Sequence, residues 1–128
     1  FSDFKYKEFI IDDKNFSGNY TPGIPKHFFY SEISTENKNK TNVKIIFRFS
    51  DKIYVNDSNA NLSDSFQILD LRLFKEFNIN ANKINLFFGI NNLLNEKYFS
   101  NIRINAWGGR FFETAPLRNY YIGTEIKI

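Results

Sequence analysis

The sequence contains no cysteine, and His27 is its only histidine. Without cysteine there is no disulfide framework, no thiol nucleophile and no cysteine-based metal site. No Ser/His/Asp arrangement for nucleophilic catalysis is present, and His27 has no metal-ligating neighbours at suitable spacing, so we expect a structural role for it. The sequence therefore predicts no catalytic residue, no metal site, no resident cofactor and no enzyme activity.

Long apolar runs are also missing, as is an initiating methionine. No run approaches the roughly 20 residues that a membrane-spanning helix needs, which excludes a helical span. A membrane β-barrel is not excluded, because each of its strands needs only about 10 residues of alternating hydrophobicity. The absent methionine predicts that the chain is a processed or excised piece of a longer protein.

A concentrated positive patch is absent too. Lys and Arg number 17 against 14 Asp and Glu, for a net charge of +3, and the basic residues are dispersed along the chain. No stripe of interleaved basic and aromatic residues is found, so nucleic acid is not predicted as a partner.

Aromatic residues, by contrast, make up 19% of the chain, with 16 Phe and 7 Tyr. In membrane barrels such rings gather at the two interfaces between lipid and water. A β-rich soluble domain would use the same rings in its core, so composition leaves both interpretations open.

Alternation with a period of two recurs along the chain and predicts an all-β fold. In one segment Leu69, Leu71 and Leu73 alternate with Asp70 and Arg72. Successive side chains of a strand point to opposite faces, so such a strand has one apolar and one polar face. We predict six antiparallel strands, at residues 4–12, 27–36, 42–54, 65–78, 83–98 and 118–128.

The predicted connections alternate in length. Residues 37–41 and 80–82 are short and rich in Asn, as hairpin turns are. Residues 13–26, 55–64 and 99–115 are longer and are polar or contain Gly and Pro. Short turns on one side of a sheet and long loops on the other are typical of outer-membrane barrels.

The last predicted strand has one apolar face, apart from a threonine, and one face that is polar, charged or small. The apolar face is predicted to contact outer-membrane lipid, and it consists of Tyr120, Ile122, Thr124, Ile126 and Ile128. Six strands are too few to close a membrane barrel, because open edges are not tolerated in lipid and single-chain bacterial barrels begin at about eight strands. Residues 1–128 are therefore interpreted as one wall segment of a larger antiparallel transmembrane barrel.

Four motifs resemble segments of a known family. NNLLNEKY, at residues 91–98, resembles a motif near the end of TonB-dependent outer-membrane receptors, with Asn95 where the family usually has Asp. GNYTPGIPKH at 18–27, YVNDSNANLSDSFQILDLRL at 54–73 and INAWGGRFFETAPLRNYYIGTEIKI at 104–128 resemble other family segments in the same order. The chain departs from the family at Leu117, where Gly is frequent, and at Ile128, where Phe is common.

The resemblance implies the C-terminal part of a barrel of about 22 strands in the bacterial outer membrane. The plug domain and the earlier strands would lie outside residues 1–128. The implied function is transport, in which exterior loops capture a ferric siderophore or a haem-like ligand that passes through the lumen when the plug is remodelled. The implied partners are outer-membrane lipid, the barrel-assembly machinery, an extracellular small molecule, and the TonB complex through the missing N-terminal region.

Ligand capture is assigned to the loop at residues 99–115. This loop gathers cations, hydrogen-bond donors and rings, which suit bulky ligands that are often anionic and partly aromatic. The candidate ligand-binding residues are Arg103, Asn105, Trp107, Arg110, Phe111 and Glu113. Just before this loop, Asn91 and Asn92 are expected to satisfy each other and the nearby backbone.

Two other classes of protein remain open. One is a soluble β-sandwich module that binds carbohydrate by stacking sugars on surface rings. The other is a small outer-membrane barrel with no transport role. A soluble domain predicts a monomer without detergent, whereas a receptor wall predicts aggregation through its sheet edges and its apolar face.

Overall fold

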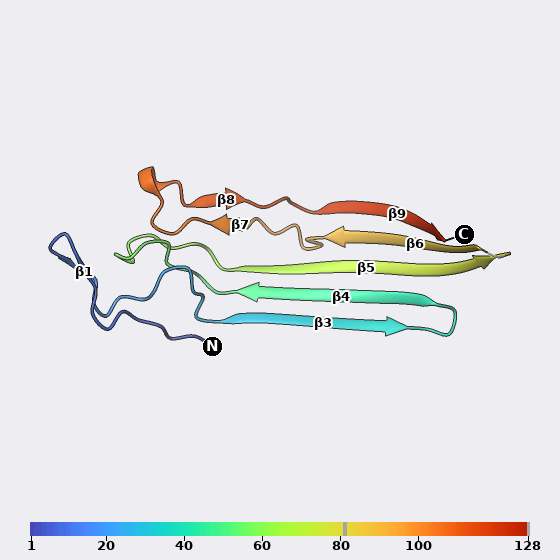
Figure 1. The fold of residues 1–128 in the computed structure, drawn as a ribbon, viewed down its shortest axis with the longest axis horizontal. Coiled ribbons are helices and arrows are strands. Elements are labelled where there is room, and N and C mark those ends of the chain that lie inside the picture. Colours follow the sequence, from blue (N-terminus) through green and yellow to red (C-terminus); the bar gives the residue numbers. More distant parts are fainter. Residues whose placement is uncertain (81, 128) are drawn as a thin grey trace. The chain divides into compact units, whose positions relative to one another are not determined.

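A computed structural model describes residues 1–80 and 82–127 and shows an all-β chain (Figure 1). Five long strands form one sheet in the order β3-β4-β5-β6-β9. The chain also forms two small sheets. In sequence order, β1-β2 precedes β3, and β7-β8 comes after β6 and before β9. The elements are β1 Ile10–Ile11, β2 Lys14–Asn15, β3 Phe28–Glu36, β4 Thr41–Ser50, β5 Phe66–Ile79, β6 Asn82–Asn91, β7 Phe99–Ile102, the 3-10 turn η1 Trp107–Gly109, β8 Phe112–Thr114 and β9 Asn119–Lys127.

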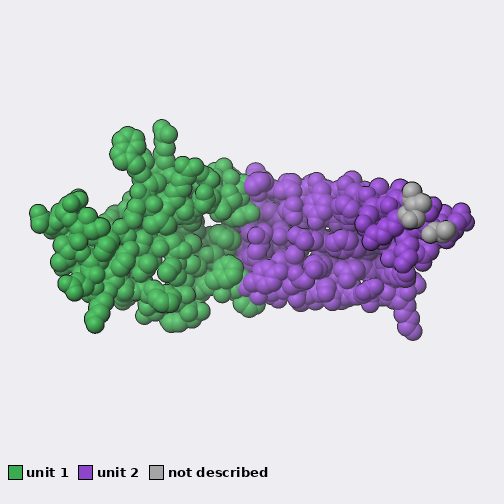
Figure 2. Space-filling view, in the orientation of Figure 1, with its two compact units in different colours: residues 1–29, 49–66, 97–115 green, residues 30–48, 67–96, 116–128 purple. Residues whose placement is uncertain are grey.

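The chain divides into two compact units (Figure 2). Unit 1 comprises residues 1–29, 49–66 and 97–115, and it contains both small sheets and the loops around them. Unit 2 comprises residues 30–48, 67–96 and 116–128, and it contains almost all of the five-stranded sheet.

Five of the six predicted strands are found in this sheet, and both predicted short turns are confirmed. The side-chain oxygen of Asn37 shapes the first turn by accepting the backbone N–H groups of Asn39 and Thr41, at 3.0 and 3.1 Å. The turn after β5 contains Asn80 at φ 56°, a left-handed conformation that Asn tolerates better than most residues. Asparagine therefore reverses the chain at both hairpins.

The strand predicted at residues 4–12 is wrong. Within that stretch only Ile10–Ile11 forms a strand, and it pairs with Lys14–Asn15. Asp12 and Asp13, at φ 46° and 61°, form the turn between them. Two successive residues in the left-handed region reverse the chain, as in a tight hairpin, so an extended strand cannot continue through them.

The strand predicted at residues 83–98 ends early, at Asn91. Asn92 takes φ 54° and leaves the sheet. Its side chain then closes a turn, donating to the carbonyl of Glu96 at 2.8 Å and accepting the Glu96 N–H at 2.9 Å. Asn91 instead donates to Asn119 on β9 at 2.9 Å. The expectation that the two asparagines bond each other is thus wrong, although Asn92 does satisfy nearby backbone.

The predicted loop at residues 99–115 contains a short hairpin. β7 and β8 pair antiparallel, with a register shift between Phe99 and Asn101, and η1 lies at the tip. The rings of Phe99 and Phe112 stack across the hairpin with centroids 4.5 Å apart. Strands of three or four residues are too short to show a clear alternation, which is why the sequence pattern missed them.

The register of β6 and β9 gives the sheet one apolar and one polar face. On one face Phe88 lies opposite Ile122, and on the other Asn85 lies opposite Glu125 and donates to it at 3.0 Å. Apolar residues therefore meet apolar ones across the strands, and polar residues meet polar ones. This pairing agrees with the alternation predicted for the last strand.

Two glycines in the same register leave room for two rings. Gly89 lies opposite Tyr121, and Gly123 lies opposite Phe87. A Cβ atom added at Gly89 would lie 2.1 Å from the Tyr121 ring, and one added at Gly123 would lie 2.2 Å from the Phe87 ring. Each ring thus occupies space that a larger residue on the neighbouring strand would fill.

Few apolar side chains are buried. In the described part of the chain Ile46, Val55 and Ile68 are the buried hydrophobic residues, while Asp70 and Asn92 are among the buried polar ones. The five-stranded sheet is open there, with β3 and β9 at its edges, and it does not close into a barrel. The structure therefore shows an antiparallel all-β fold with five strands in its main sheet.

Candidate functional site

Two of the candidate ligand-binding residues hold the β7-β8 hairpin of unit 1. Arg103 and Glu113 form an ion pair with each other, and Asn101 Nδ2 donates to the same carboxylate at 3.1 Å. The hydrogen bonds from Asn101 and Arg103 lower the pKa of Glu113. The backbone N–H of Arg103 also donates to the carbonyl of Phe111 at 2.8 Å. The charges of Arg103 and Glu113 thus neutralise each other within the hairpin.

Asn105 is engaged with another loop of unit 1. Its Nδ2 donates to Asp57 Oδ2 at 2.7 Å, and its Oδ1 accepts the Asp57 N–H at 3.0 Å. The other carboxylate oxygen of Asp57 accepts the Tyr6 hydroxyl at 2.7 Å. Burial, together with this hydrogen bond, raises the pKa of Tyr6 to about 12. Asp57 and Asn105 lie 48 positions apart, so no local pattern in the sequence could have paired them.

Trp107 and Arg110 remain open to solvent at the tip of the same loop. Trp107 is 96% exposed, and Arg110 is exposed and has no hydrogen bond or ion pair to any residue that the structure describes. Gly108 and Gly109 lie between them at φ 70° and 72°, a conformation that glycine adopts without strain. Phe111 packs edge-on against the neighbouring ring of Phe112, with centroids 6.0 Å apart. Among the six candidate residues, the ring of Trp107 and the guanidinium of Arg110 are therefore the groups most open to a ligand.

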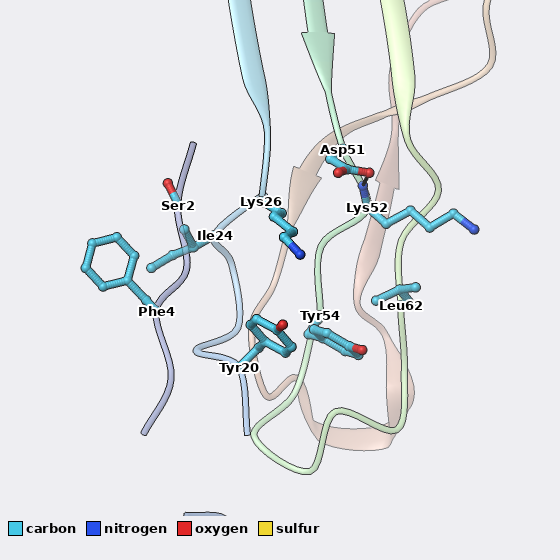
Figure 3. Close-up of a pocket in the computed structure, with 9 residues that line it drawn as sticks. All are labelled: Ser2, Phe4, Tyr20, Ile24, Lys26, Asp51, Lys52, Tyr54 and Leu62. Carbon is cyan, nitrogen blue, oxygen red and sulfur yellow. Dashed lines mark hydrogen bonds between the residues drawn. The ribbon is translucent and has the colours of Figure 1, made fainter. Parts of the chain in front are cut away.

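A cavity of about 250 Å³ in unit 1 was not indicated by the sequence (Figure 3). The ammonium group of Lys26 points toward the rings of Tyr20 and Tyr54, which stack with centroids 5.7 Å apart. Phe4 and Ile24 form an apolar wall beside them. These residues come from separate segments, so their proximity leaves no local signal in the sequence. Asp51 and Lys52 also line the cavity, which therefore combines charges of both signs with hydroxyls and apolar walls.

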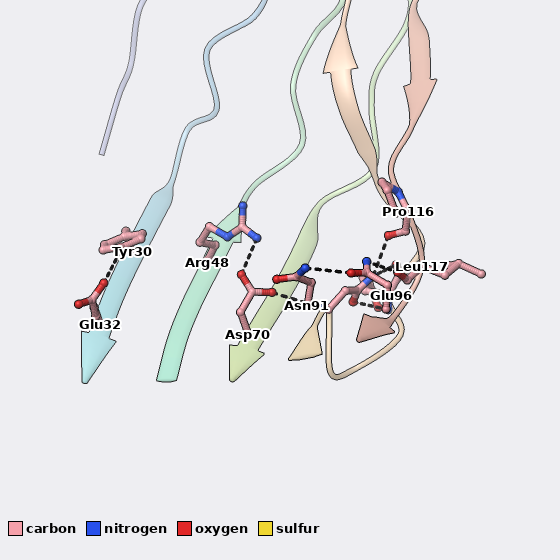
Figure 4. Close-up of polar contacts among 10 residues, drawn as sticks. Tyr30, Glu32, Arg48, Asp70, Asn91, Glu96, Pro116 and Leu117 are labelled. Carbon is pink, nitrogen blue, oxygen red and sulfur yellow. Dashed lines mark hydrogen bonds and ion pairs between the residues drawn. The ribbon is translucent and has the colours of Figure 1, made fainter. Parts of the chain in front are cut away.

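The polar face of the five-stranded sheet carries a row of charged contacts in unit 2 (Figure 4). Glu32 on β3 pairs with Lys44 on β4 at 2.7 Å and accepts the Tyr30 hydroxyl at 3.0 Å. Arg48 on β4 pairs with Asp70 on β5 at 3.0 Å. Opposite charges on neighbouring strands favour this one pairing of the strands over shifted ones.

Asp70 is the most buried charged residue of this face, with 5% of its surface exposed. Besides its ion pair with Arg48, its Oδ1 accepts the backbone N–H of Asn92 at 2.8 Å. One carboxylate therefore joins β4, β5 and the turn that follows β6. The alternation placed Asp70 on the polar face, but nothing in the sequence identified its two partners.

The residues predicted to face lipid share one face of β9, namely Tyr120, Ile122, Thr124 and Ile126, whereas Ile128 lies outside the described residues. Ile122 is 82% exposed, and Tyr120 and Ile126 are also exposed. The neighbouring strand β6 adds exposed Leu86 to the same face. A soluble antiparallel sheet normally covers its apolar face and leaves its polar face to water. In this sheet the apolar face is open, and the buried groups lie on the polar one.

His27 lies in unit 1, where its Nδ1 contacts Asp51 Oδ2 at 3.0 Å and its ring packs near Phe1. The described residues contain no group of three or more His, Cys, Asp or Glu side chains placed to hold a metal ion. They also contain no helix of the length and apolar character required to cross a membrane. A scan against models of known protein families gives no match to this chain.

Proposed function

We propose that this chain is a wall segment of a larger outer-membrane β-barrel of the TonB-dependent receptor kind, with its apolar sheet face against lipid. The observation that carries the proposal is the exposed apolar face of β6 and β9. Leaving a large apolar side chain such as Ile122 in water forgoes about 1.5–3 kcal/mol of burial free energy. Lipid contacts would recover this free energy without a second protein layer.

The opposite face supports the same assignment. Its ion pairs, such as Arg48 with Asp70, lie on the side that would line a wet lumen. In a membrane barrel, charges on the lipid side are destabilising, whereas charges on the lumen side are tolerated. Among the charged residues of the five strands only Lys75 lies on the apolar face, close to the short turn after β5. This distribution fits a barrel wall.

The connections support one orientation of that wall. The turns after β3 and β5 are short, whereas the connections after β4 and β6 are long (Figure 1). In outer-membrane barrels the short turns face the periplasm and the long loops face the exterior. Trp107 and Arg110 lie in the long connection after β6 and would meet ligand from outside. A ferric siderophore or haem-like ligand offers the negative charge and planar groups that Arg and Trp bind.

The two other classes of protein find less support. A soluble sandwich needs a second sheet over the apolar face, but the other sheets in the described residues have two strands each, of two to four residues. A complete small barrel needs about eight strands, and the main sheet has five.

Spin labels on single cysteines test the lipid contact, because the chain has no cysteine of its own. Ile126→Cys and Glu125→Cys differ by one position and face opposite sides of β9. In lipid bilayers we expect the label at position 126 to be more accessible to oxygen, and the label at 125 to be more accessible to a water-soluble nickel complex. Equal access of the nickel complex to both labels would overturn the proposal.

Ligand capture has an intrinsic probe, since Trp107 is the only tryptophan of the chain. We expect haem, or a ferric tris-catecholate complex, to quench its fluorescence, and Arg110→Ala to weaken the quenching titration about tenfold through loss of a charge-assisted contact. Lys38→Ala, which removes a positive charge from the short turn after β3, is the matched control. Quenching that is equally strong in both variants argues against capture at this loop.

A further inference from the structure

Arg72 is a cation on the polar face of unit 2 that its neighbours do not pair. Lys44 and Arg48 on β4 have carboxylate partners, and Lys40 pairs with Glu76. The side chain of Arg72 on β5 makes no hydrogen bond or ion pair within the described ranges, although its charge acts on Glu32 from a longer distance. The hydrogen-bond donors of Arg72 are thus available beside three cations that are already paired.

Two donor atoms at this place are also buried without an acceptor. They are the Nε atoms of Arg48 and Arg72. A buried donor without an acceptor costs about 1–3 kcal/mol, and more when the group is charged. Such groups are rare in native proteins and are usually explained by an acceptor on a water, an ion or a bound molecule. The two Nε–H groups therefore indicate an acceptor that comes from outside this chain.

Both arginines line one cavity of about 350 Å³ on the polar face. Its two carboxylates are already engaged, Glu32 with Lys44 and Tyr30, and Asp70 with Arg48 and the turn after β6. Figure 4 shows Arg48 reaching Asp70 through a terminal nitrogen, which leaves its Nε outside that pair. The cavity therefore has room and two free donors, and both of its carboxylates are already engaged.

We propose that Arg48 and Arg72 form a binding site for a carboxylate. The Nε–H and one terminal N–H of a guanidinium form a planar fork that matches the two oxygens of a carboxylate. Glu32 and Asp70 line the same cavity and repel a second negative charge, so a monoanion is favoured over a dianion such as phosphate. The carboxylate belongs either to an acidic side chain of a partner polypeptide or to a free small acid. This site depends only on the polar face and does not rest on the proposed function.

Side-chain NMR of the full chain tests the site, with acetate as the probe. At constant ionic strength we expect acetate to shift the Nε–Hε signals of Arg48 and Arg72, and phosphate or chloride to shift them much less. Arg72→Gln should weaken acetate binding about tenfold, the effect of losing a charge-assisted hydrogen bond. Arg72→Lys keeps the charge without the planar fork and should also weaken it.

Lys83→Gln is the matched control, because it removes one positive charge from the same face without lining the cavity. It should leave acetate binding unchanged. If a partner polypeptide supplies the carboxylate, acetate will shift the two signals in the chain alone but not in the native assembly. If the ligand is a free acid, acetate will shift them in both. Titration of the unaltered chain without an acetate-specific shift would falsify the proposal whatever the variants do.

Discussion

Asp70 shows how much of unit 2 depends on a single side chain. Its carboxylate accepts from Arg48 on β4 and from the backbone of Asn92 after β6. Burying a carboxylate costs solvation free energy. The hydrogen bonds from Arg48 and Asn92 compensate this cost. Asn92, the other buried polar residue that the structure describes in unit 2, bonds through its side chain to the backbone of Glu96.

Replacing Asp70 by Ala should lower the free energy of unfolding by about 1.5–3 kcal/mol, because Arg48 and the backbone N–H of Asn92 lose a charged acceptor. Denaturant unfolding in detergent micelles measures this loss. Asp64→Ala removes an exposed carboxylate from the chain segment just before β5 and should change stability by less than about 0.5 kcal/mol. Equal effects of the two substitutions would contradict the role assigned to the ion pair.

Tyr6 gives unit 1 a dependence on alkaline pH. Its pKa is raised from 10.0 to about 12, first by burial and then by the hydrogen bond to Asp57. The folded state holds this proton more tightly than the unfolded state, so the stabilisation is complete below pH 10 and is lost as pH rises toward 12. In an absorbance titration of tyrosinate, we expect the step near pH 12 to disappear in Tyr6→Phe.

At the scale of elements, β6 and β9 contact each other at two positions where an aromatic ring of one strand lies over a glycine of the other. The Tyr121 ring lies over Gly89, and the Phe87 ring lies over Gly123. Aromatic rings that cover glycines on a neighbouring strand fix the register of a sheet, because a shift by one residue removes both fits.

Gly89→Ala should destabilise the protein by about 1–3 kcal/mol, since the new methyl group collides with the Tyr121 ring. Adding Tyr121→Ala to this variant should recover part of the loss, and unfolding of the single and double variants measures the coupling. Thr124→Ala, on the open face of the same strand, serves as the control. Strict additivity of Gly89→Ala and Tyr121→Ala would show that the ring and the glycine do not interact.

The same elements show which parts of the fold a sequence can reveal. Alternation predicted the five strands of the main sheet, because the side-chain period is local to each strand. It failed at residues 4–12, where Asp12 and Asp13 reverse the chain, and at Asn92, which ends β6 by bonding to its own turn. The pairing of Asp57 with Asn105 and the cavity around Tyr54 depend on contacts between distant segments, which alternation does not encode.

For the whole molecule, the question is which medium each surface meets. In unit 2 the described residues form a single sheet, with ion pairs on one face and exposed apolar residues on the other. The edges β3 and β9 each present unpaired backbone groups. Such a sheet aggregates in water through its edges and its apolar face unless lipid and further strands cover them.

A charge placed on the open face should therefore be costly in a bilayer. We expect Ile122→Arg to lower stability in lipid vesicles by about 2–4 kcal/mol if position 122 lies near the bilayer midplane. Glu125→Arg, on the polar face of the same strand, should cost much less. Urea unfolding in vesicles compares the two, and a soluble protein would show little difference between them.

The route by which β9 reaches β6 also determines the order in which the sheet assembles. β3-β4 and β5-β6 are hairpins closed by short turns, whereas β9 pairs with β6 only after the chain has passed through residues 92–118. Pairing across a long separation in sequence is slower than closing a hairpin. Both hairpins should therefore form first, with Gly89 uncovered until Tyr121 arrives. Pairing of β9 with β6 is then the step that completes the sheet. Loss of β9 would leave both hairpins formed, but β6 would lack the partner whose ring covers its glycine.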